Sequence, residues 1–242
     1  LMDRQAERAP IGANRWWLET FVFAQAYADL YNGGDVAAEV EALNAGEARY
    51  SDYMRPGFEF LKTLIDLGYV DAENALVSEA FEGAGEGEDF MAGKCPIVMA
   101  YWGAANTDTA YGSPSFNMEV IGFPSARGQM PVLSMTGCGV GERAEHRDEA
   151  LEVVDVICSD EALQLYAETN RVISPSKNVE VECVEALRPL NDLVQADTYV
   201  LASNAGMDVE QWGNTCLIVR DLLGGASVDE CMAKLDALQD AA

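Results

Sequence analysis

The chain has 242 residues, 49% of them hydrophobic, which is enough for one large domain or two smaller domains with an apolar core. It carries 15 Lys and Arg residues against 41 Asp and Glu residues, so its formal net charge is −26. A charge of this sign argues against nucleic acid and anionic membranes as partners, and its simplest interpretation is solubility. No apolar run reaches the roughly eighteen residues that a membrane-spanning helix needs.

The first predicted element is a helix from Asn14 to Tyr31, ended by the sequence Asn32-Gly33-Gly34. Trp17 belongs to its apolar stripe and is expected in the core. Trp16 points off that stripe, which is unusual for so large an apolar side chain unless it meets a ligand or another element. The other residues of the stripe are Phe21, Ala24, Ala28 and Tyr31.

A second helix and a loop are predicted next. The helix runs from Ser51 to Gly68, and Pro56 is tolerated in its first turns. The Gly- and Glu-rich segment from Glu82 to Glu88 is predicted to be a solvated, mobile loop. It is no phosphate-binding loop, because its acidic side chains would repel the anion. The apolar face of the helix consists of Met54, Phe58, Leu61 and Ile65.

The segment from Glu88 to Gly103 is the most informative part of the sequence. Gly93 permits the backbone conformation of a tight turn. Pro96 through Ala100 is a short apolar run of the buried-strand type. Tyr101 and Trp102 follow directly and offer flat apolar faces with a polar tip, the kind of surface on which a sugar ring stacks.

The second half of the chain is predicted to contain a pair of strands followed by helices. Residues 125–129 form the turn between the strands, and Ser227 with Glu230 makes a capping box before the last helix. The strands are expected at Phe116–Phe123 and Met130–Met135, and the helices at His146–Ile157, from Ser159 onward, near Val184–Val194 and at Trp212–Leu223.

The cysteines and the single histidine point to no catalytic or metal site. The sequence has no Cys-x-x-Cys spacing, and one His cannot build a His-metal site. His146 is expected to be a polar surface residue. We expect free thiols that pack as small hydrophobes, with one disulfide left open as an alternative. Four of the six cysteines sit in apolar segments, namely Cys95, Cys138, Cys158 and Cys216.

Several stretches resemble the extracellular solute-binding proteins of carbohydrate ABC importers, the maltose-binding-protein-like family 1. Phe90 to Gly103 resembles the family's F-x-x-G-K-x-A-M-x-x-x-G-x-W segment. Residues 116–128 resemble its V-x-x-x-P-x-x-x-G crossing between lobes, and residues 145–161 its S-K-N-P-E-x-A segment, although Glu145-His146 replaces the usual Asn-Pro. The tail from Trp212 onward resembles the family's closing pair of helices.

The resemblance implies an α/β fold of the type II periplasmic-binding-protein class. It covers roughly Pro10 to Asp240 and corresponds to the carboxy-terminal portion of the family only. Residues 1–8 also lack the pattern of a signal peptide, so we expect the later part of a longer protein whose amino-terminal half is absent. Residues 1–123 and 188–242 would form the mostly helical carboxy-terminal lobe, and residues 124–187 a crossing segment of the amino-terminal lobe.

The family captures solutes and catalyses nothing, so the resemblance implies a sugar- or oligosaccharide-binding protein that serves an ABC importer permease. Closure of two lobes about a hinge would enclose the ligand. The protein would be extracellular or held at the cell surface, as a lipoprotein in its full-length form, and would need no cofactor. Trp212 begins the same apolar stripe as Cys216, so a core role for it is equally open. The residues expected at the ligand are Asn14, Trp16, Trp17, Tyr101, Trp102 and Trp212.

Two other functions remain as alternatives. A glycoside hydrolase also uses carboxylates and tryptophans, and among 41 acidic residues a catalytic pair could occur almost anywhere. The sequence nevertheless has no Gly-x-Ser-x-Gly and no His-Glu-x-x-His motif, so no catalytic residue is predicted. A protein-interaction domain would need an exposed apolar surface, which a face intended for a missing lobe would provide.

Overall fold

The computed structural model describes residues 9–77, 84–100, 115–134, 137–204 and 206–242, which form a mixed, mostly helical fold. The helices are α1 (Glu19–Ala26), α2 (Ala28–Gly33), α3 (Val36–Asn44), α4 (Tyr50–Asp66), α5 (Ala72–Val77), α6 (Ala84–Met91), α7 (Arg147–Ile157), α8 (Asp160–Asn170), α9 (Arg188–Gln195), α10 (Trp212–Leu223) and α11 (Val228–Ala241). The strands are β1 (Ile11–Gly12), β2 (Ile97–Val98), β3 (Phe123–Ser125), β4 (Gly128–Met130), β5 (Val132–Leu133) and β6 (Val200–Leu201). They pair as parallel β1–β2, antiparallel β3–β4 and parallel β5–β6.

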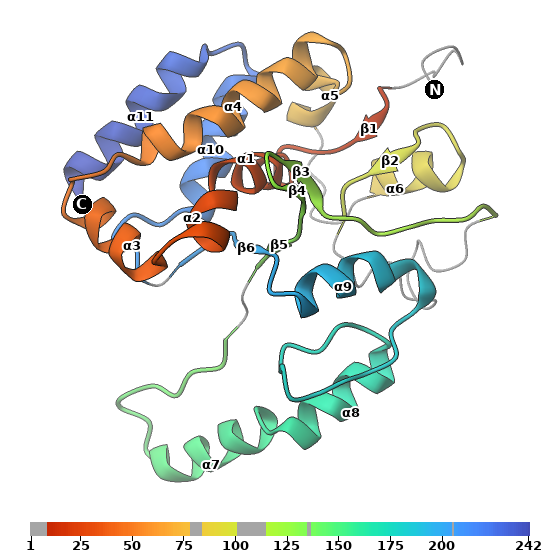
Figure 1. Cartoon of the computed structure of the whole chain (residues 1–242), viewed down its shortest axis with the longest axis vertical. Coiled ribbons are helices and arrows are strands. Elements are labelled where there is room, and N and C mark those ends of the chain that lie inside the picture. Colours follow the sequence, from red (N-terminus) through yellow and green to blue (C-terminus); the bar gives the residue numbers. More distant parts are fainter. Residues whose placement is uncertain (1–8, 78–83, 101–114, 135–136, 205) are drawn as a thin grey trace. The chain divides into compact units, whose positions relative to one another are not determined.

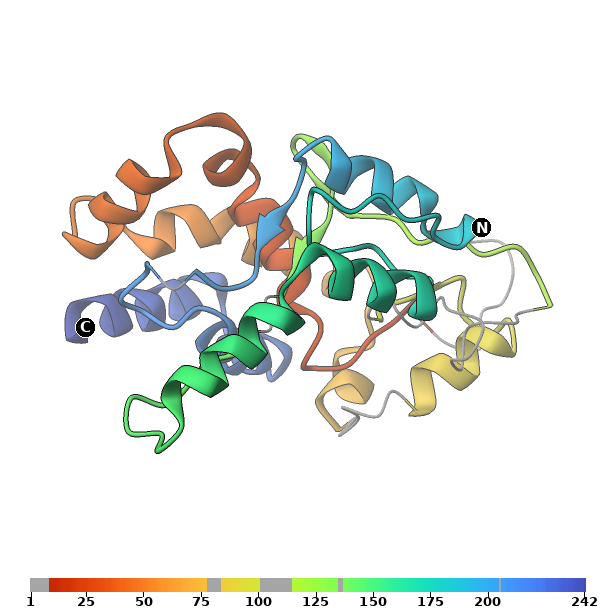
Figure 2. The same cartoon turned by 90° about the horizontal axis from the view of Figure 1, so that it is seen from below.

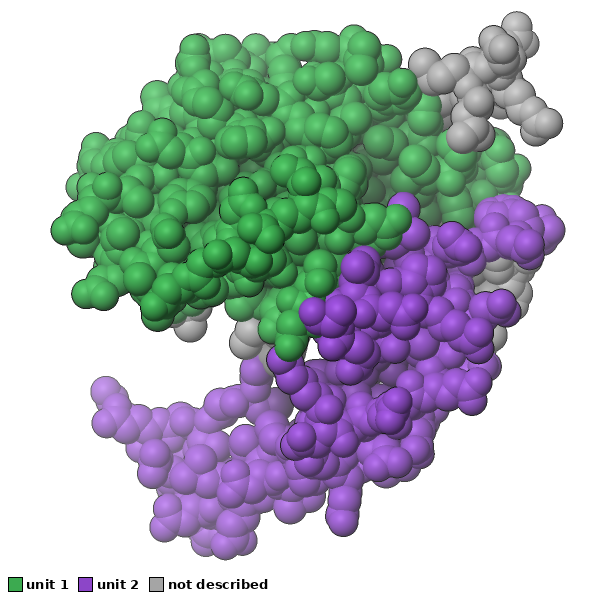
Figure 3. Space-filling model, in the orientation of Figure 1, with its two compact units in different colours: residues 1–101, 122–134, 197–242 green, residues 102–121, 135–196 purple. Residues whose placement is uncertain are grey.

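The chain divides into two compact units (Figure 3). Unit 1 comprises residues 1–101, 122–134 and 197–242, and unit 2 comprises residues 102–121 and 135–196. The hairpin β3–β4 belongs to unit 1 because Phe123 packs edge-on against Phe21 of α1, with ring centroids 5.0 Å apart. Strand β5 belongs there too, since it pairs with β6. The lobe of a larger protein to which each unit corresponds stays a prediction.

Helix α1 is the centre of unit 1. It packs against α4, α10 and β3, and α11 packs on the outside against α4 and α10 (Figure 1 and Figure 2). Four consecutive apolar residues of α1 are buried, namely Phe21, Val22, Phe23 and Ala24, so most of its circumference is enclosed. A helix of this kind belongs in the interior of a domain. Glu19, in the first turn of this helix, is therefore placed in the core, whereas Thr20 and Gln25 are half-buried.

The crossing of α1 and α4 is unusually close. A Cβ atom built at Gly57 of α4 would lie 2.5 Å from the carbonyl oxygen of Val22 and 2.7 Å from its Cα. The neighbouring Pro56 lies inside α4, where it lacks the N–H that would bond to the carbonyl of Asp52. Glycine is thus required at this crossing because any larger side chain would collide with the backbone of α1. The two residues that weaken α4, Pro56 and Gly57, are therefore adjacent.

The first predicted helix is broken in the structure. Its residues form α1 and α2, which are separated at Tyr27, where the backbone leaves helical geometry (φ −109°, ψ 5°). Helix α1 begins only at Glu19, because the side chain of Asn14 turns the chain before it. The second predicted helix is confirmed as α4, and its expected stop, Gly68, has a positive φ of 71°.

The expectation of a solvated loop at Glu82–Glu88 is wrong for its described part. Residues from Ala84 onward belong to α6, in which Glu86 is buried. Helix α6 lies against β1, where a Cβ at Gly12 would be 3.2 Å from the Sγ of Cys95 and 3.3 Å from the Cβ of Glu86. Packing therefore overrides the glycine-rich composition. The tight turn expected after this segment is confirmed by the φ of 71° at Gly93.

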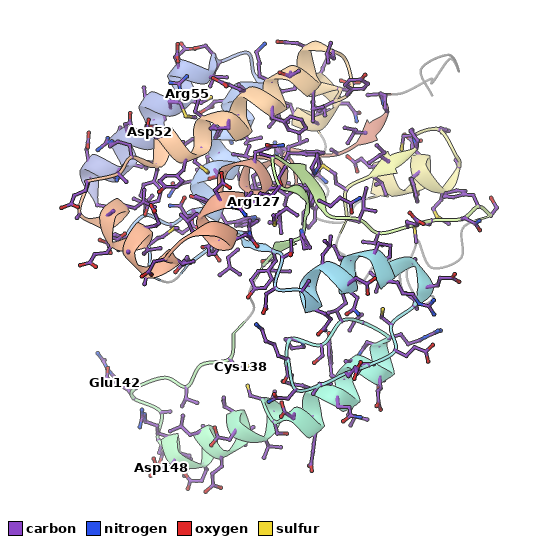
Figure 4. All side chains as sticks on the ribbon, viewed as in Figure 1. Asp52, Arg55, Arg127, Cys138, Glu142 and Asp148 are labelled. Carbon is purple, nitrogen blue, oxygen red and sulfur yellow. The ribbon has the colours of Figure 1, made fainter. Side chains whose placement is uncertain are left out.

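The predicted strands at Phe116–Phe123 and Met130–Met135 are much shorter in the structure. Only β3 at the end of the first, and β4 and β5 around the second, belong to sheets. The expected turn at 125–129 is confirmed, with Gly128 at a φ of 101°. Arg127 at its tip (Figure 4) bonds to the carboxylate of Asp29 and, at 3.0 Å, to the carbonyl of Asn32, which ties the hairpin to α2.

Unit 2 has a small core and a large exposed apolar surface. Its core centres on Ile173, Cys183, Val184, Leu187 and Leu190. The predicted helices α7 and α8 are present, and Ser159 caps α8 by accepting from the backbone N–H of Ala162. Helix α7 contains no buried residue. Large apolar side chains are thus exposed on both helices, namely Leu151, Val153, Val156, Ile157, Leu165 and Tyr166.

The six cysteines are all free in the structure, but they are not all buried. Cys95 and Cys216 lie in the core, as expected. Cys138 and Cys158 are exposed, contrary to the expectation from their apolar neighbours, and Figure 4 shows Cys138 on the stretch before α7. The reason is that α7 presents its apolar side chains to the surface, so that the residues flanking it are not covered.

The predicted capping box of α11 is confirmed and allows a quantitative expectation. The Ser227 hydroxyl accepts from the Glu230 backbone N–H at 3.2 Å, and the Glu230 carboxylate accepts from the Ser227 N–H at 2.8 Å. We expect Ser227→Ala to lower the free energy of unfolding by about 1 kcal/mol and Ser227→Thr, which retains the hydroxyl, to cost less. Urea unfolding followed by circular dichroism measures both, and equal stability of the two variants would contradict the role of the cap.

Candidate functional site

The residues that follow the parallel strands β1 and β2 lie at the same edge of unit 1. Ile11 pairs with Ile97 and Gly12 with Val98, and the N–H of Met99 then donates to the carbonyl of Gly12 at 3.0 Å. Because the carboxyl ends of parallel strands lie at one edge, Ala13 to Trp16 and Met99 to Ala100 leave from the same side. Ligands of open α/β proteins bind at such edges.

Asn14 organises the chain that leaves β1. It is buried, with only 2% of its surface exposed. Its Oδ1 accepts from the N–H of Trp16 at 2.9 Å, and its backbone carbonyl accepts from the N–H of Trp17 at 3.1 Å. Asparagine often stabilises turns in this way, by bonding to the backbone two residues on. Asn14 therefore fixes the backbone from which the side chains of Trp16 and Trp17 project.

Arg15 secures the same turn from the other side. Its guanidinium donates to the carbonyl of Leu76 at 3.0 Å, and its backbone N–H donates to the carbonyl of Ala75 at 3.1 Å. The guanidinium carbon lies 5.2 Å from the centre of the Trp16 ring, within the range of a cation–π contact. One face of Trp16 is thus covered by a residue that is anchored on α5.

Trp212 joins this region through a hydrogen bond to α1. Its indole Nε1–H donates to the Oε1 of Glu19 at 3.0 Å. Glu19 stands in the first turn of α1 and Trp212 is the first residue of α10, so the amino-terminal ends of these helices meet. Trp17 and Trp212 are both partly buried and pack against the core of unit 1.

Glu19 is the most perturbed carboxyl group at this junction. It is completely buried, and burial raises its pKa from 4.5 to about 8 against the opposing effect of its hydrogen bonds. Its Oε2 has no hydrogen-bond partner among the described residues, and the same is true of the buried hydroxyl of Thr215 on α10. Burial and the charge of Glu19 also raise the pKa of the Cys216 thiol, which lies beside the carboxyl. Glu19 is therefore held in its protonated, neutral form near neutral pH.

A second buried polar contact joins Tyr27, the residue after α1, to Gln211, the residue before α10. The hydroxyl of Tyr27 donates to the Oε1 of Gln211 at 2.6 Å, and the Nε2 of Gln211 donates to the carbonyl of Val209 at 2.7 Å. Burial raises the pKa of Tyr27 well above its ordinary value, so the hydroxyl keeps its proton. Residues 211 and 212 are thus both fixed by side chains from the first helical segment.

Two of the solved structures that resemble this chain carry names of binding proteins. The chitin oligosaccharide binding protein matches with a TM-score of 0.70 at 19% identity, over 98% of this chain and 60% of that one. The putative binding protein MsmE of Bacillus subtilis, in an open conformation, gives 0.64 at 15% identity, over 97% and 59%. A structure from work on xylan utilization by the thermophilic bacterium Caldanaerobius polysaccharolyticus gives 0.62 at 14% identity, over 96% and 61%. No protein-family model and no curated protein matches the chain.

The chain has the fold of part of a solute-binding protein. It spans about 60% of the length of each of the three matched chains named above. The resemblance that the sequence motifs indicated is thereby confirmed at the level of the fold. The assignment of residues 1–123 and 188–242 to one lobe and of 124–187 to the other remains a prediction.

Four of the six residues expected at the ligand of this solute-binding fold are described, and all four belong to unit 1. Asn14, Trp16 and Trp17 follow β1, and Trp212 begins α10. Tyr101 and Trp102 lie outside the described residues. Sequence reasoning missed Arg15 and Glu19.

A signal for Glu19 was present in the sequence. The consecutive apolar residues at positions 21–24 indicate a helix that is buried on all sides, and a carboxylate in its first turn is then buried as well. For Arg15 we find no comparable signal. Its partners are carbonyl groups of residues 75 and 76, which lie far away in the sequence.

The part of the chain that the structure describes contains no group of three or more His, Cys, Asp or Glu side chains arranged to hold a metal ion. Within the same residues, no helix has both the length and the apolar character to cross a membrane. The one histidine, His146, is exposed at the start of α7, as expected, and lies 3.8 Å from the carboxylate of Glu149.

Proposed function

We propose that this protein binds a sugar or an oligosaccharide as part of a solute-binding protein of an ABC importer. The observation that carries the proposal is the fold, which matches the chitin oligosaccharide binding protein over 98% of this chain. The gathering of tryptophans after β1 and at the start of α10 supports it, because sugar rings stack on aromatic faces. On this proposal, delivery of the sugar to a permease outside the cell or at its surface would be the role of the whole protein.

The proposed binding surface consists of the aromatic residues of the edge described above. Trp16, Trp17 and Trp212 would contribute ring faces, together with Tyr101 and Trp102, which continue the chain after β2. Asn14 is proposed to act by holding the turn of Trp16 and Trp17, since its Oδ1 already accepts a backbone N–H.

A titration of the chain with oligosaccharides tests this function. Fragments of chitin and xylan are the probes of choice, given the names of the matched structures. A solute-binding protein encloses its ligand from two sides. We expect intrinsic fluorescence to change at millimolar rather than micromolar concentration, because the chain spans about 60% of the matched proteins and would offer one side of the cleft. A thousandfold difference in the dissociation constant corresponds to roughly 4 kcal/mol of binding free energy.

Replacing Trp102 by alanine is expected to remove most of that response and to leave the far-ultraviolet circular dichroism unchanged. The matched control is Tyr166→Ala, which removes an exposed aromatic ring from α8 of unit 2. Unfolding of the Trp102 variant would make that residue structural. Release of reducing ends from any tested glycan would overturn the receptor and favour the glycoside hydrolase instead.

A further inference from the structure

The hydrogen bond between Trp212 and Glu19 is set in the interior of unit 1. Glu19 has no exposed surface, and its Oε1 lies 3.0 Å from the indole nitrogen. A buried carboxyl oxygen that loses its only donor is left without a hydrogen bond, because no water reaches it to replace the indole. Trp212 can therefore not turn its N–H away from Glu19 without a cost of this kind. The carboxyl group fixes the direction of the ring.

We propose that Glu19 is a positioning residue for sugar binding, which holds the indole of Trp212 in the orientation that presents its ring to the ligand. This inference rests on the function proposed above. Glu19 would not touch the sugar, since it is completely buried. It acts through Trp212 alone, in the way that residues behind a binding surface fix the rotamers of those that form it.

Three features of the surroundings support this role. Trp212 opens α10, whose first turn is held by the Glu210 carboxylate, which accepts from the backbone N–H of Gly213 at 2.9 Å. Gln211 is held by Tyr27, which anchors the backbone from which Trp212 projects. Finally, Glu19 stands on α1, the most enclosed helix of the unit, so its carboxyl group has little freedom to move.

The chemistry of the contact predicts which substitutions preserve it. The bond needs an oxygen acceptor at the position of Oε1 and does not need a charge. Glutamine offers such an oxygen with nearly the same shape, whereas methionine fills the space but offers no comparable acceptor. Glu19→Gln should therefore retain the orientation of Trp212, and Glu19→Met should lose it.

The test measures sugar affinity and ring orientation separately. With chitin and xylan oligosaccharides as probes, Glu19→Met is expected to weaken binding about fivefold to tenfold, the loss typical of one hydrogen bond. Glu19→Gln should stay within about twofold, a difference too small for loss of such a bond. In a Trp212→Phe background, Glu19→Met should cause no further loss, because the two residues act through one contact. Equal affinity of Glu19→Met and the unaltered chain, or equal weakening by Gln and Met, would overturn the proposal.

A second measurement needs no ligand and no variant at Glu19. The chain has four tryptophans, so its indole N–H groups give four signals in a nitrogen–proton correlation spectrum, and Trp212→Phe identifies one of them. We expect that signal to exchange slowly with deuterium in the unaltered chain. Rapid exchange would overturn the positioning role even if sugar binds. Slow exchange in a chain that binds no sugar would instead contradict the proposed function. The contact between Glu19 and Trp212 would then exist without a role in sugar binding.

Discussion

Replacing Gly57 by alanine is expected to destabilise unit 1 by about 3 kcal/mol, as in other cases of overpacking in a core. The new Cβ would lie 2.5 Å from the carbonyl oxygen and 2.7 Å from the Cα of Val22. These are backbone atoms of α1, a helix enclosed by α4, α10 and β3, so they cannot move aside as a flexible side chain would. Helix propensity acts in the opposite direction, because alanine in a helix is favoured over glycine by about 1 kcal/mol. The steric cost is the larger of the two effects, so we expect the substitution to lower the free energy of unfolding.

The matched control for this substitution is Gly34→Ala. Gly34 ends α2 in an extended conformation, and a Cβ at this position meets no atom within 4 Å. We expect its effect to stay within about 0.5 kcal/mol, as for most surface substitutions. Urea unfolding followed by circular dichroism measures both variants. A Gly57→Ala protein as stable as the unaltered chain would mean that α1 and α4 do not cross at this point.

Gly57 also illustrates which features of the fold could not be predicted from the sequence. The apolar face of α4, its stop at Gly68 and the capping box of α11 are signals contained in a few consecutive residues, and the structure confirms them. The need for glycine at position 57 arises from Val22, which is distant in the sequence. The break of the first predicted helix at Tyr27 and the helix at residues 84–91 have the same cause. In each case contacts between segments override the local composition.

The candidate site divides in a similar way. Tryptophan is rare and large, so its positions could be noticed in the sequence, and three of the four tryptophans are described in unit 1. The residues that hold them could not be identified from spacing. Arg15 is fixed by carbonyl groups of α5, and the partner of Trp212 stands on α1. A sequence therefore indicates which side chains are suited to bind a sugar, while the fold decides which neighbours orient them.

The stability of unit 1 is expected to fall as the pH rises from about 4.5 to about 8, and Glu19 is the expected cause. Burial raises its pKa from 4.5 to about 8, so in this range the folded protein keeps a proton that the unfolded chain has lost. Folding stability then decreases with increasing pH, because the native state binds more protons. Below the lower value both states are protonated, and above the upper value both are ionised, so the effect is confined to this window.

The comparison of Glu19→Gln with the unaltered chain isolates this contribution. Glutamine cannot ionise, while the other titrating groups, including the neighbouring thiol of Cys216, are common to both proteins. At about 1.4 kcal/mol for each pH unit, the stability of the variant relative to the unaltered chain should rise across the window by a few kcal/mol, with about 5 kcal/mol as the upper limit. Urea unfolding at pH 4.5, 6 and 8 measures the difference. Parallel stability curves for the two proteins would show that Glu19 ionises normally and is not enclosed between α1 and α10.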